Sequence, residues 1–554
     1  MKKVVFFLFI TAFIISCLHS EKEPQKNQME WEQVHPGIWK GVVGTPPDIS
    51  LIRASGSQSR PEALDRLGNP DFPLDPKNME MRHAGNKTYI RFPLQRNEQI
   101  YGLGLHFKTI HRRGQIMRLH VDHYGGHDNG RTHAPVPFFV SSEGYGVLID
   151  AARYIDAYVG TGVRKDSQDP PPVQDRNTDP NWSARPYSDN IELVCAGPGV
   201  QIYVFAGPGM LQAIQRFNLL CGGGIIPPKW GLGFWQRTPA LFSDEDVHAE
   251  IRSFNERNFP LDVIGLEPGW HSGAYPCTFE WDPDRFPEPA RFTEQLLEKG
   301  IRLNLWMNPY LSPNGSLYEK MEPWTGSHTV WNGIVPDFTL EPPRNLMKEH
   351  LKRNLLDIGI SGFKVDEVDG YDVWLWPDAA QFPSGLDGEV MRQVYGLLTM
   401  DLIRELYEEK GERTYGLVRA ANAGAASMPF VIYNDYYSHR DFITALVNSS
   451  FSGILWTPEV RSSATAEEWL RRFQTVCFSP LAMINAWADG TKPWSFPEVE
   501  DEVRDYALLR MQLLPYLYAT FSDYYLEGIP PFRAMVLQDG FHPVLKDRDE
   551  KALI

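Results

Sequence analysis

Downstream of Pro227 the sequence alternates short apolar runs with longer amphipathic segments, and this alternation restricts the fold more than any other feature. Helices are indicated between the runs, for example where Val247, Ile251 and Phe254 share one face. The apolar runs are residues 232–235, 262–266, 302–306, 362–365, 414–418, 430–433, 453–456 and 481–484. Eight such runs predict an α/β fold of the (β/α)8 TIM-barrel type over residues 227–500. A doubly wound sheet is the competing architecture, but no glycine-rich phosphate-binding turn follows the first run.

The preceding part of the chain has a different pattern. Residues 30–226 contain short runs of alternating polarity separated by glycine and polar clusters, namely 88–92, 137–140, 146–149 and 201–205. This pattern predicts an N-terminal antiparallel β-sandwich. The stretch 165–186 is rich in proline and aspartate, lacks periodicity and is interpreted as a long surface loop. Residues 501–554 are expected to form a helix over 503–526, interrupted at Pro515, and then the start of a C-terminal β region.

The first twenty residues have the features of a targeting segment. Lys2 and Lys3 precede an apolar stretch that reaches Ile15 and is followed by Ser16 and Cys17. Because the stretch is too short for a membrane-spanning helix, we interpret residues 1–20 as a secretory signal. Its end resembles a bacterial lipoprotein cleavage box, in which Cys17 carries the lipid. We therefore expect an exported bacterial protein, periplasmic or anchored to the outer membrane, that touches the membrane only through a lipid anchor; a plain exported protein is the alternative.

Charge and cysteine content exclude some partners. The 54 basic and 70 acidic side chains give a net charge of −16, which argues against a nucleic-acid partner. The remaining cysteines are Cys195, Cys221, Cys277 and Cys477. None has the spacing of a zinc site, so they are interpreted as buried free thiols, with a disulfide as the alternative.

The candidate functional residues lie at the carboxyl ends of the predicted strands, where barrel enzymes place their catalytic groups. In chain order these are Glu267, Asn308, Asp366, Arg419, Asp435, Trp456 and Asn485. Asp366 and Asp435 each follow a strongly apolar run, and a pair of opposed carboxylates is what glycoside cleavage requires. Aspartates that cap the next helix are the alternative. Glu367 and Asp369 compete with Asp366 for the same role.

Several longer segments resemble glycoside hydrolase family 31. Those that resemble its barrel and the following helix are residues 227–236, 259–264, 299–309 and 513–518, and those that resemble its N-terminal sandwich are 101–104 and 141–147. Residues 362–366 resemble the family's nucleophile strand and residues 433–435 its acid/base strand. Arg419 stands where the family keeps an arginine in the sugar site. The resemblance thus follows nearly the whole chain in order.

This resemblance implies a retaining, exo-acting α-glycosidase that acts on an oligosaccharide or glycoside and uses no metal or organic cofactor. Asp366 would be the nucleophile, and Asp435 would be the acid/base. Lys364 would help to keep the nucleophile ionised, although a structural ion pair is an equal alternative. Trp306 and Trp456 are expected to form flat walls for the sugar, whereas we interpret the strand-end Trp235 as a core residue.

Three positions at the predicted sugar site depart from the pattern common in the α-glucosidases of the family. Glu267 stands where the family usually has Asp, Pro458-Glu459 replaces a His/Ser-Asp pair, and Asn485 stands where His is typical. Because one extra methylene shifts a carboxylate enough to select a different hydroxyl orientation, we predict that the sugar is not glucose and that the protein is an α-galactosidase.

Other functions stay open at this stage. The three changes are also compatible with an α-glucosidase or α-xylosidase, and with N-acetylgalactosamine as the sugar. A non-catalytic glycan-binding lipoprotein on a decayed hydrolase scaffold is a further alternative, against which the presence of both carboxylates argues. Family members usually continue into C-terminal sandwich domains, so the end at Ile554 indicates a truncated or an unusually short chain.

Overall fold

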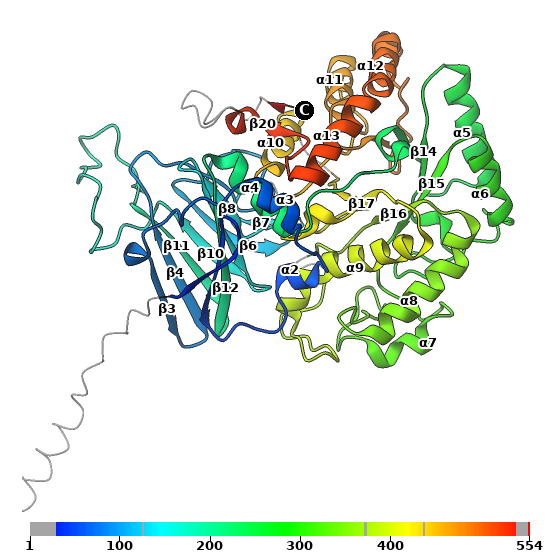
Figure 1. Ribbon diagram of the computed structural model, residues 1–554. Coiled ribbons are helices and arrows are strands. Elements are labelled where there is room, and N and C mark those ends of the chain that lie inside the picture. The colour runs from blue at the N-terminus through cyan, green and yellow to red at the C-terminus, as the bar shows by residue number, and fades with distance from the viewer. Residues whose placement is uncertain are drawn as a thin grey trace, which may run out of the picture.

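The structure is a computed structural model that describes residues 29–123, 127–184, 186–370, 374–435 and 438–538, and the backbone of residues 552–553. Two antiparallel sheets lie on one side of the molecule, and a parallel sheet with its helices lies on the other (Figure 1). The predicted signal segment with Cys17 falls outside the described residues. In the part of the chain that is described, no helix has the length and hydrophobicity needed to cross a membrane.

The N-terminal part consists of two six-stranded sheets. The first contains, in spatial order, β1 (Trp31–His35), β2 (Ile38–Gly44), β12 (Gly199–Ala206), β9 (Tyr145–Asp150), β8 (Phe138–Ser141) and β5 (Ile100–Gly102). The second contains β3 (Glu80–Ala84), β4 (Lys87–Pro93), β11 (Asn190–Ala196), β10 (Ile155–Val159), β6 (Gln115–Val121) and β7 (Arg131–Thr132). Neighbouring strands are antiparallel, apart from β6 and β7.

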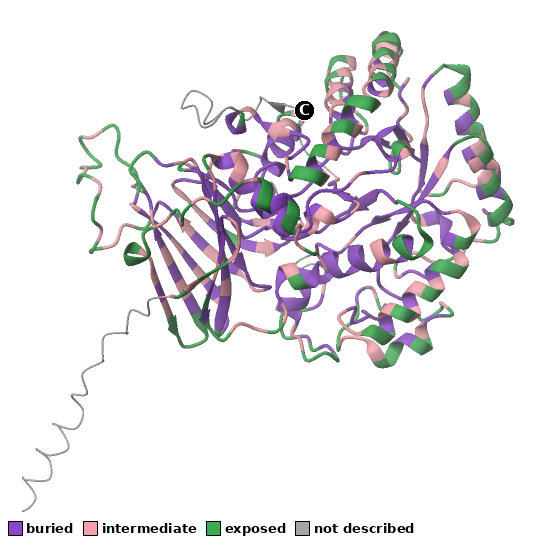
Figure 2. Ribbon diagram, viewed as in Figure 1, coloured by how far each residue is buried: buried purple, intermediate pink, exposed green. Residues whose placement is uncertain are grey.

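The two sheets pack face to face through the side chains that the alternating pattern places inward. In β4, Thr88, Ile90 and Phe92 are buried and the residues between them are not. Ile90 and Phe92 belong to one buried cluster with Val147 of β9 on the other sheet, which confirms the predicted antiparallel sheets. The predicted surface loop is also confirmed, since most of residues 167–184 are exposed (Figure 2).

The second part is built on a seven-stranded parallel sheet. Its spatial order is β18 (Phe430–Ile432), β17 (Gly416–Val418), β16 (Gly362–Val365), β15 (Arg302–Met307), β14 (Val263–Leu266), β13 (Phe234–Arg237) and β19 (Ala482–Asn485). These strands are almost entirely buried, as expected where helices cover a parallel sheet. Seven of the eight predicted strands are therefore confirmed, with their bounds shifted by at most two residues.

The strand predicted at 453–456 is wrong, because this segment forms single bridges and no ladder. Ile432 of β18 bridges Trp456, and Val460 bridges Ile484 of β19, both in parallel orientation. Pro458 lies between the two bridges and has no N–H to donate, which interrupts any continuous pairing. The segment still joins the two edge strands of the sheet, and a closed eight-stranded barrel stays a prediction.

The described residues also form a series of α-helices. They are α2 (Leu51–Ala54), α3 (Pro61–Arg66), α4 (Met210–Leu220), α5 (Asp244–Glu256), α6 (Pro289–Glu298), α7 (Tyr318–Met321), α8 (Glu341–Asn354), α9 (Gly388–Lys410), α10 (His439–Ser449), α11 (Ala466–Cys477), α12 (Glu500–Gln512) and α13 (Leu514–Glu527). Ser243 and Asp246 form a capping box at α5, and Thr465 caps α11. The predicted long C-terminal helix is interrupted near Pro515, as expected. A short pairing of β20 (Arg533–Ala534) with β21 (Ala552–Leu553) follows.

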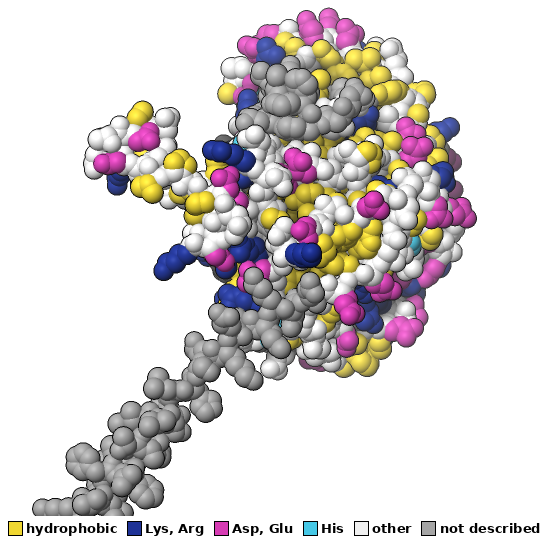
Figure 3. Space-filling view, turned by 60° about the vertical axis from the view of Figure 1, so that its left-hand side comes forward, with side chains coloured by type: hydrophobic (Ala, Val, Ile, Leu, Met, Phe, Trp, Pro, Cys, Tyr) yellow, Lys and Arg dark blue, Asp and Glu magenta, His cyan; other side chains and the backbone are white. Residues whose placement is uncertain are grey.

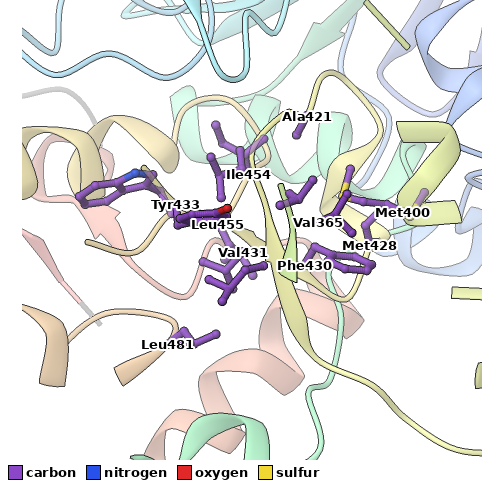
Figure 4. Packing of buried hydrophobic residues seen from close by; sticks show 14 of the residues in the cluster. Val365, Met400, Ala421, Met428, Phe430, Val431, Tyr433, Ile454, Leu455 and Leu481 are labelled. Atoms are coloured by element: carbon purple, nitrogen blue, oxygen red, sulfur yellow. The ribbon is translucent and has the colours of Figure 1, made fainter. Parts of the chain in front are cut away.

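Strand β18 is fixed by buried side chains on both of its faces. Val431 and Tyr433 lie with Leu455, whereas Phe430 lies with Met428 on the other side (Figure 4). This alternation is the two-residue period of a strand, which points successive side chains to opposite faces. The core therefore determines the direction in which the chain leaves β18, toward residues 434 and 435.

The N-terminal part contacts the carboxyl ends of the parallel strands. The backbone N–H of Ala421, beyond β17, donates to the carbonyl oxygen of His133 at 3.0 Å. The N–H of Val121 donates to the side chain of Gln393 in α9 at 2.7 Å. Residues 121–133, with their undescribed gap at 124–126, thus connect the sandwich to the end of the parallel sheet where polar residues gather. The cysteines Cys195, Cys221, Cys277 and Cys477 are free and buried, as predicted.

Candidate active site

Adjacent strands bring the candidate residues together. The residue pairs Val365–Val418 of β16 and β17 and Met307–Val365 of β15 and β16 are in register. Asp366 and Arg419 are the next residues along their strands, and each N–H continues the ladder by donating to the neighbouring strand. Their side chains leave the same end of the sheet, which is the end expected to carry function.

Arg419 joins the two carboxylates that the sequence singles out. Its Nη1 donates to Oδ1 of Asp366 at 3.2 Å and to Oδ2 of Asp435 at 2.7 Å. Because one nitrogen serves both, these two oxygens can lie no farther apart than the sum of those distances. This limit applies to that one pair of oxygens, and it fits the roughly 5–5.5 Å between the carboxyl groups of retaining glycosidases better than the roughly 6.5–9.5 Å of inverting ones.

Asp366 is buried and held by several donors. Trp306 Nε1 donates to Oδ2 at 2.7 Å, and the N–H of Glu367 donates to Oδ1 at 2.9 Å. Lys364 Nζ lies 4.0 Å from Oδ2. Together with Arg419, these groups stabilise the ionised carboxylate and fix its orientation.

Asp435 is held less tightly and is more open. About a third of its side chain is exposed, 33% against 8% for Asp366. Burial raises the pKa of Asp435, but attraction to Arg419, Lys364 and His123 outweighs it and lowers that pKa to about 2. Arg461 donates to the backbone carbonyl oxygen of Asp435, which fixes the main chain there. Residues 436–437 lie outside the described residues.

The structure distinguishes Asp366 from its two rivals. Burial and the neighbouring Asp366 raise the pKa of Glu367 to about 9, so this carboxyl is protonated at neutral pH. Glu367 also has a left-handed backbone (φ +59°), which is strained for a residue with a side chain. Asp369 is fully buried and contacts Arg419, His123 and His133. Of the three carboxyl groups, Asp366 is the one that shares Nη1 of Arg419 with Asp435.

Glu267, Lys364 and Arg237 form a second buried ionic cluster. Lys364 Nζ lies 3.1 Å from each carboxylate oxygen of Glu267, and Arg237 donates to Oε1. Arg237, the last residue of β13, also donates to Asn304 at 2.8 Å. Lys364 is thus closer to Glu267 than to Asp366. The structure places the three charges together at the ends of β13, β14 and β16.

Beside these charges lie buried polar atoms for which the described part of the chain offers no hydrogen-bond partner. They are Oε2 of Glu459, Nδ2 of Asn485, Nδ2 of Asn434 and the hydroxyl of Tyr433. The other oxygen of Glu459 accepts from Trp487 Nε1 at 3.0 Å. Burial, and then repulsion by Asp435, raise the pKa of Glu459 to about 8. Buried polar groups are normally paired, so these atoms indicate a place for the hydroxyls of a ligand or for water.

The tryptophans have different surroundings. Trp306 bonds to Asp366, as above, and packs against Tyr275 with ring centroids 5.1 Å apart. Trp456 is completely buried and donates to Asn434 at 2.7 Å. Trp235 is completely buried and donates to the carbonyl oxygen of Gly231, which confirms its interpretation as a core residue. Asn308 bonds to the loop backbone at Ala274.

Two histidines of the N-terminal part reach the site, and the sequence reasoning missed them. Nδ1 of His133 lies 2.7 Å and that of His123 3.3 Å from Oδ2 of Asp369. His123 also contacts Nη2 of Arg419. A signal was available, since residues 120–133 contain four histidines. Among the described residues, no group of three or more His, Cys, Asp or Glu side chains is arranged to hold a metal ion.

Comparison with family models gives two matches in the order expected. Residues 224–520 match the glycosyl hydrolases family 31 TIM-barrel domain, and residues 25–156 match the glycosyl hydrolase 31 N-terminal galactose mutarotase-like domain. The chain belongs to glycoside hydrolase family 31. The match covers the parallel sheet, both candidate carboxylates and the segment that carries the two histidines.

Individual family 31 members are similar at a lower level. The chain is 26% identical to alpha-xylosidase XylQ of Lactiplantibacillus pentosus over 83% of its length and 60% of the relative's, and 28% identical to Alpha-glucosidase 2 of Bacillus thermoamyloliquefaciens over 93% and 66%. It therefore spans less than two thirds of these curated relatives. A Flavobacterium johnsoniae GH31 dextranase complexed with glucose has the same fold, with a TM-score of 0.75, 19% identity, and coverage of 95% of this chain and 66% of the dextranase.

Proposed function

We propose that this family 31 protein is a retaining, exo-acting α-glycoside hydrolase that releases one terminal α-linked sugar. The observation that carries the proposal is the single nitrogen of Arg419 that bonds to both Asp366 and Asp435. It supports a separation of the two carboxylates that leaves no room for a water between nucleophile and sugar, as an inverting reaction requires.

In the proposed first step, an oxygen of Asp366 attacks the anomeric carbon as the glycosidic C–O bond breaks. Asp435 gives its proton to the departing oxygen, and a covalent glycosyl ester forms on Asp366. In the second step the ionised Asp435 takes a proton from water, the hydroxide oxygen bonds to the anomeric carbon, and the ester bond breaks. Two inversions leave the sugar with its original α configuration.

The first step requires a proton on Asp435, whose pKa is low in the free protein. Glu459, with a pKa of about 8, holds a proton at neutral pH. Asp435 and Glu459 line one cavity of about 330 Å³, together with Arg461. We infer that Asp435 and Glu459 share this proton. A sugar placed between Asp366 and Asp435 would weaken the contact of Asp435 with Arg419, and the proton would then move from Glu459 to Asp435.

We propose galactose as the sugar. Both oxygens of Glu267 are already bound by Lys364, and one also by Arg237, whereas Glu459 and Asn485 each keep an unpaired buried atom. These two positions depart from the α-glucosidase pattern, so their free groups are suited to a hydroxyl of different orientation. Xylose or glucose is the second candidate, which the similarity to alpha-xylosidases and an alpha-glucosidase favours.

Initial rates on the nitrophenyl α-galactoside, α-glucoside, α-xyloside and α-N-acetylgalactosaminide test the sugar. The galactoside is expected to be the best substrate, and equal or better rates on the glucoside or xyloside would reject galactose. Proton NMR of the first product tests the stereochemistry, with the α anomer expected before mutarotation. The variant Asp366→Ala is the control that separates this activity from contaminants.

We also propose that the protein is exported and lipidated at Cys17. The basic and apolar start of the sequence and its Ser16-Cys17 end support this proposal. Cells expressing the full chain and its Cys17→Ser variant would be labelled with a palmitate analogue. Label is expected on the first protein only, in the membrane fraction, and equal labelling of the two would contradict it.

A further inference from the structure

Arg419 uses all three nitrogens of its guanidinium group. Nη1 bonds to Asp366 and to Asp435. Nε donates to Oδ2 of Asp369 at 3.3 Å, and Nη2 contacts Nδ1 of His123. The guanidinium group is planar and rigid, and Nε and Nη2 donate along one edge of it. The groups that hold this edge therefore fix the direction in which Nη1 points.

Asp369 is the charged group on that edge. Its side chain is fully buried, and its Oδ2 also lies 2.7 Å from Nδ1 of His133. Burial raises the pKa of Asp369, but the charge of Arg419 and the contacts with the two histidines outweigh burial and lower that pKa well below its ordinary value. Burial lowers the pKa of His133, so this ring is neutral at neutral pH, and the charge of Asp369 favours the tautomer with the proton on Nδ1. Asp369 is thus an ionised carboxylate held between an arginine and a neutral imidazole.

His133 comes from the N-terminal sandwich and is itself anchored to the parallel sheet. It directly follows β7, and its side chain is 1% exposed. Its backbone carbonyl oxygen accepts from the N–H of Ala421 at 3.0 Å. His133 therefore contacts the stretch after β17 at two points, at Ala421 through its backbone and at Arg419 through Asp369.

Helix α9 closes the other side of this stretch. A Cβ atom on Gly396 would lie 2.2 Å from the carbonyl oxygen of Ala420, so helix and stretch approach as closely as glycine allows. One turn earlier in α9, Gln393 accepts from the N–H of Val121 in β6 at 2.7 Å. The same helix thus contacts both the stretch that carries Arg419 and the sandwich.

His123 holds the edge of the guanidinium less firmly than His133 does. Its side chain is 39% exposed, against 1% for His133. Its Nδ1 faces both Nη2 of Arg419 and, at 3.3 Å, Oδ2 of Asp369. One ring nitrogen cannot accept from the first and donate to the second at the same time. The firm support of Arg419 is therefore the pair of Asp369 and His133.

We propose that Asp369 and His133 are positioning residues, which hold Arg419 so that Nη1 lies between the two candidate carboxylates. His133 acts only through Asp369 and Arg419, and through it the sandwich supplies part of the active site. This inference rests on the proposed glycosidase activity. A displacement of about 1 Å between reacting groups can cost about 100-fold in rate, so loss of this support should be measurable.

Two replacements of His133 test whether its ring nitrogen matters. His133→Leu removes the nitrogen, whereas His133→Asn keeps a donor because Nδ2 of asparagine can occupy the place of Nδ1. The substrate is the α-glycosyl fluoride of the sugar that the nitrophenyl panel selects, since it reacts without an acid and keeps weak variants measurable. His133→Leu should lower kcat/KM by about 10- to 100-fold, and His133→Asn should restore it to within about threefold of the unmodified protein.

The matched control is His106→Leu. His106 is an equally buried histidine of the N-terminal part, and its ring bonds to the carbonyl oxygen of Leu103 at 2.7 Å. This variant should lower the thermal midpoint and change kcat/KM by less than about threefold. Asp369→Asn is the second variant, in case His133→Leu does not fold, and it should show the same loss as His133→Leu.

A second comparison separates positioning from a merely structural role. In Arg419→Lys, a single Nζ cannot bond along an edge, so the group that His133 positions is gone. His133→Leu should then cost less than about threefold in the Arg419→Lys background, whereas a structural role would cost the same factor in both backgrounds. If Arg419→Lys has no measurable turnover, the recovery in His133→Asn decides.

Three results would overturn the assignment: equal losses in the two backgrounds, a loss in His133→Asn as large as in His133→Leu, or no loss in either His133→Leu or Asp369→Asn. Absence of turnover of the fluoride by the unmodified protein would instead reject the proposed function, and the inference with it.

Discussion

The surroundings of Asp366 and Asp435 differ although one arginine nitrogen bonds to both. Asp366 follows a buried strand directly and accepts from an indole, a backbone N–H and Arg419. Asp435 lies three residues beyond β18, is a third exposed, and accepts from Arg419. On the surface, Figure 3 shows acidic and basic side chains interspersed over the visible face, in contrast to the buried charges of the site.

This difference corresponds to the two roles that a retaining hydrolase must separate. A nucleophile needs a permanent negative charge in a fixed direction, and many donors provide both. An acid/base must gain and lose a proton in each turnover, so it needs access to water and few competing donors. The number of donors and the exposure thus support the two proposed roles without reference to sequence resemblance.

The largest expected effect follows from removing the nucleophile. Asp366→Ala should lower kcat by at least about 10⁴-fold on aryl glycosides and glycosyl fluoride alike, because no covalent intermediate can form. Initial rates on both substrates measure this loss, with the thermal midpoint as a check on folding. Retained turnover would show that the nucleophile is another residue or that the activity belongs to a contaminant.

Unlike Asp366→Ala, the variant Asp435→Asn should affect some substrates much more than others. Without an acid, hydrolysis of a disaccharide should fall by about 10²- to 10⁴-fold, whereas formation of the glycosyl-enzyme from the fluoride needs no proton and should be retained. Added azide should then attack the intermediate and give an α-glycosyl azide, detectable by NMR. A loss of the initial burst of fluoride release as large as the loss on the disaccharide, with no rescue of turnover by azide, would contradict the acid/base assignment.

Local patterns predicted the two candidate carboxylates that Arg419 joins, because each follows its own apolar run. Arg419 was predicted in the same way, since it continues β17 as Asp366 continues β16. The bonds among these three residues depend only on neighbouring strands of one sheet, and that order can be inferred from an α/β repeat.

Other parts of the site depend on contacts that no local pattern encodes. His123 reaches Arg419 from 296 residues away, through the packing of the sandwich against the parallel sheet. The missing strand at 453–456 is a different case, since Pro458, which has no N–H to donate, is a local signal against continuous pairing.

A smaller effect is expected from Trp306→Phe, which removes only the indole donor to Asp366. A hydrogen bond to a charged group contributes about 1.5–3 kcal/mol, so kcat/KM should fall by about 10- to 100-fold. Trp456→Phe removes an indole donor to Asn434 and is the matched control, with a change in thermal midpoint but a much smaller one in kcat/KM. If both variants lose the same activity, the bond to Asp366 has no special role.

The smallest effect concerns stability and pH, where Glu459 and Asp435 should act with opposite signs. The pKa of Glu459 is raised to about 8 from an ordinary value of 4.5, so folding takes up a proton between these values and stability falls as the pH rises through this window. The pKa of Asp435 is lowered to about 2, so the stability that Asp435 contributes is present above its ordinary pKa of 3.8 and is lost as the pH falls through about 2.

Glu459→Gln should therefore flatten the decrease in stability between pH 5 and 8, by at most about 1.4 kcal/mol for each unit of pKa difference. Urea midpoints at pH 5, 6.5 and 8 measure this slope in the two proteins. Asp435→Asn removes a charge that raises the pKa of Glu459, so it should flatten the slope in the same direction, but less than Glu459→Gln because burial is the larger cause of that shift. If stability has the same slope in Glu459→Gln and in the unmodified protein, Glu459 is ionised from pH 5 to 8. Glu367 would then be the carboxyl that supplies the proton to Asp435.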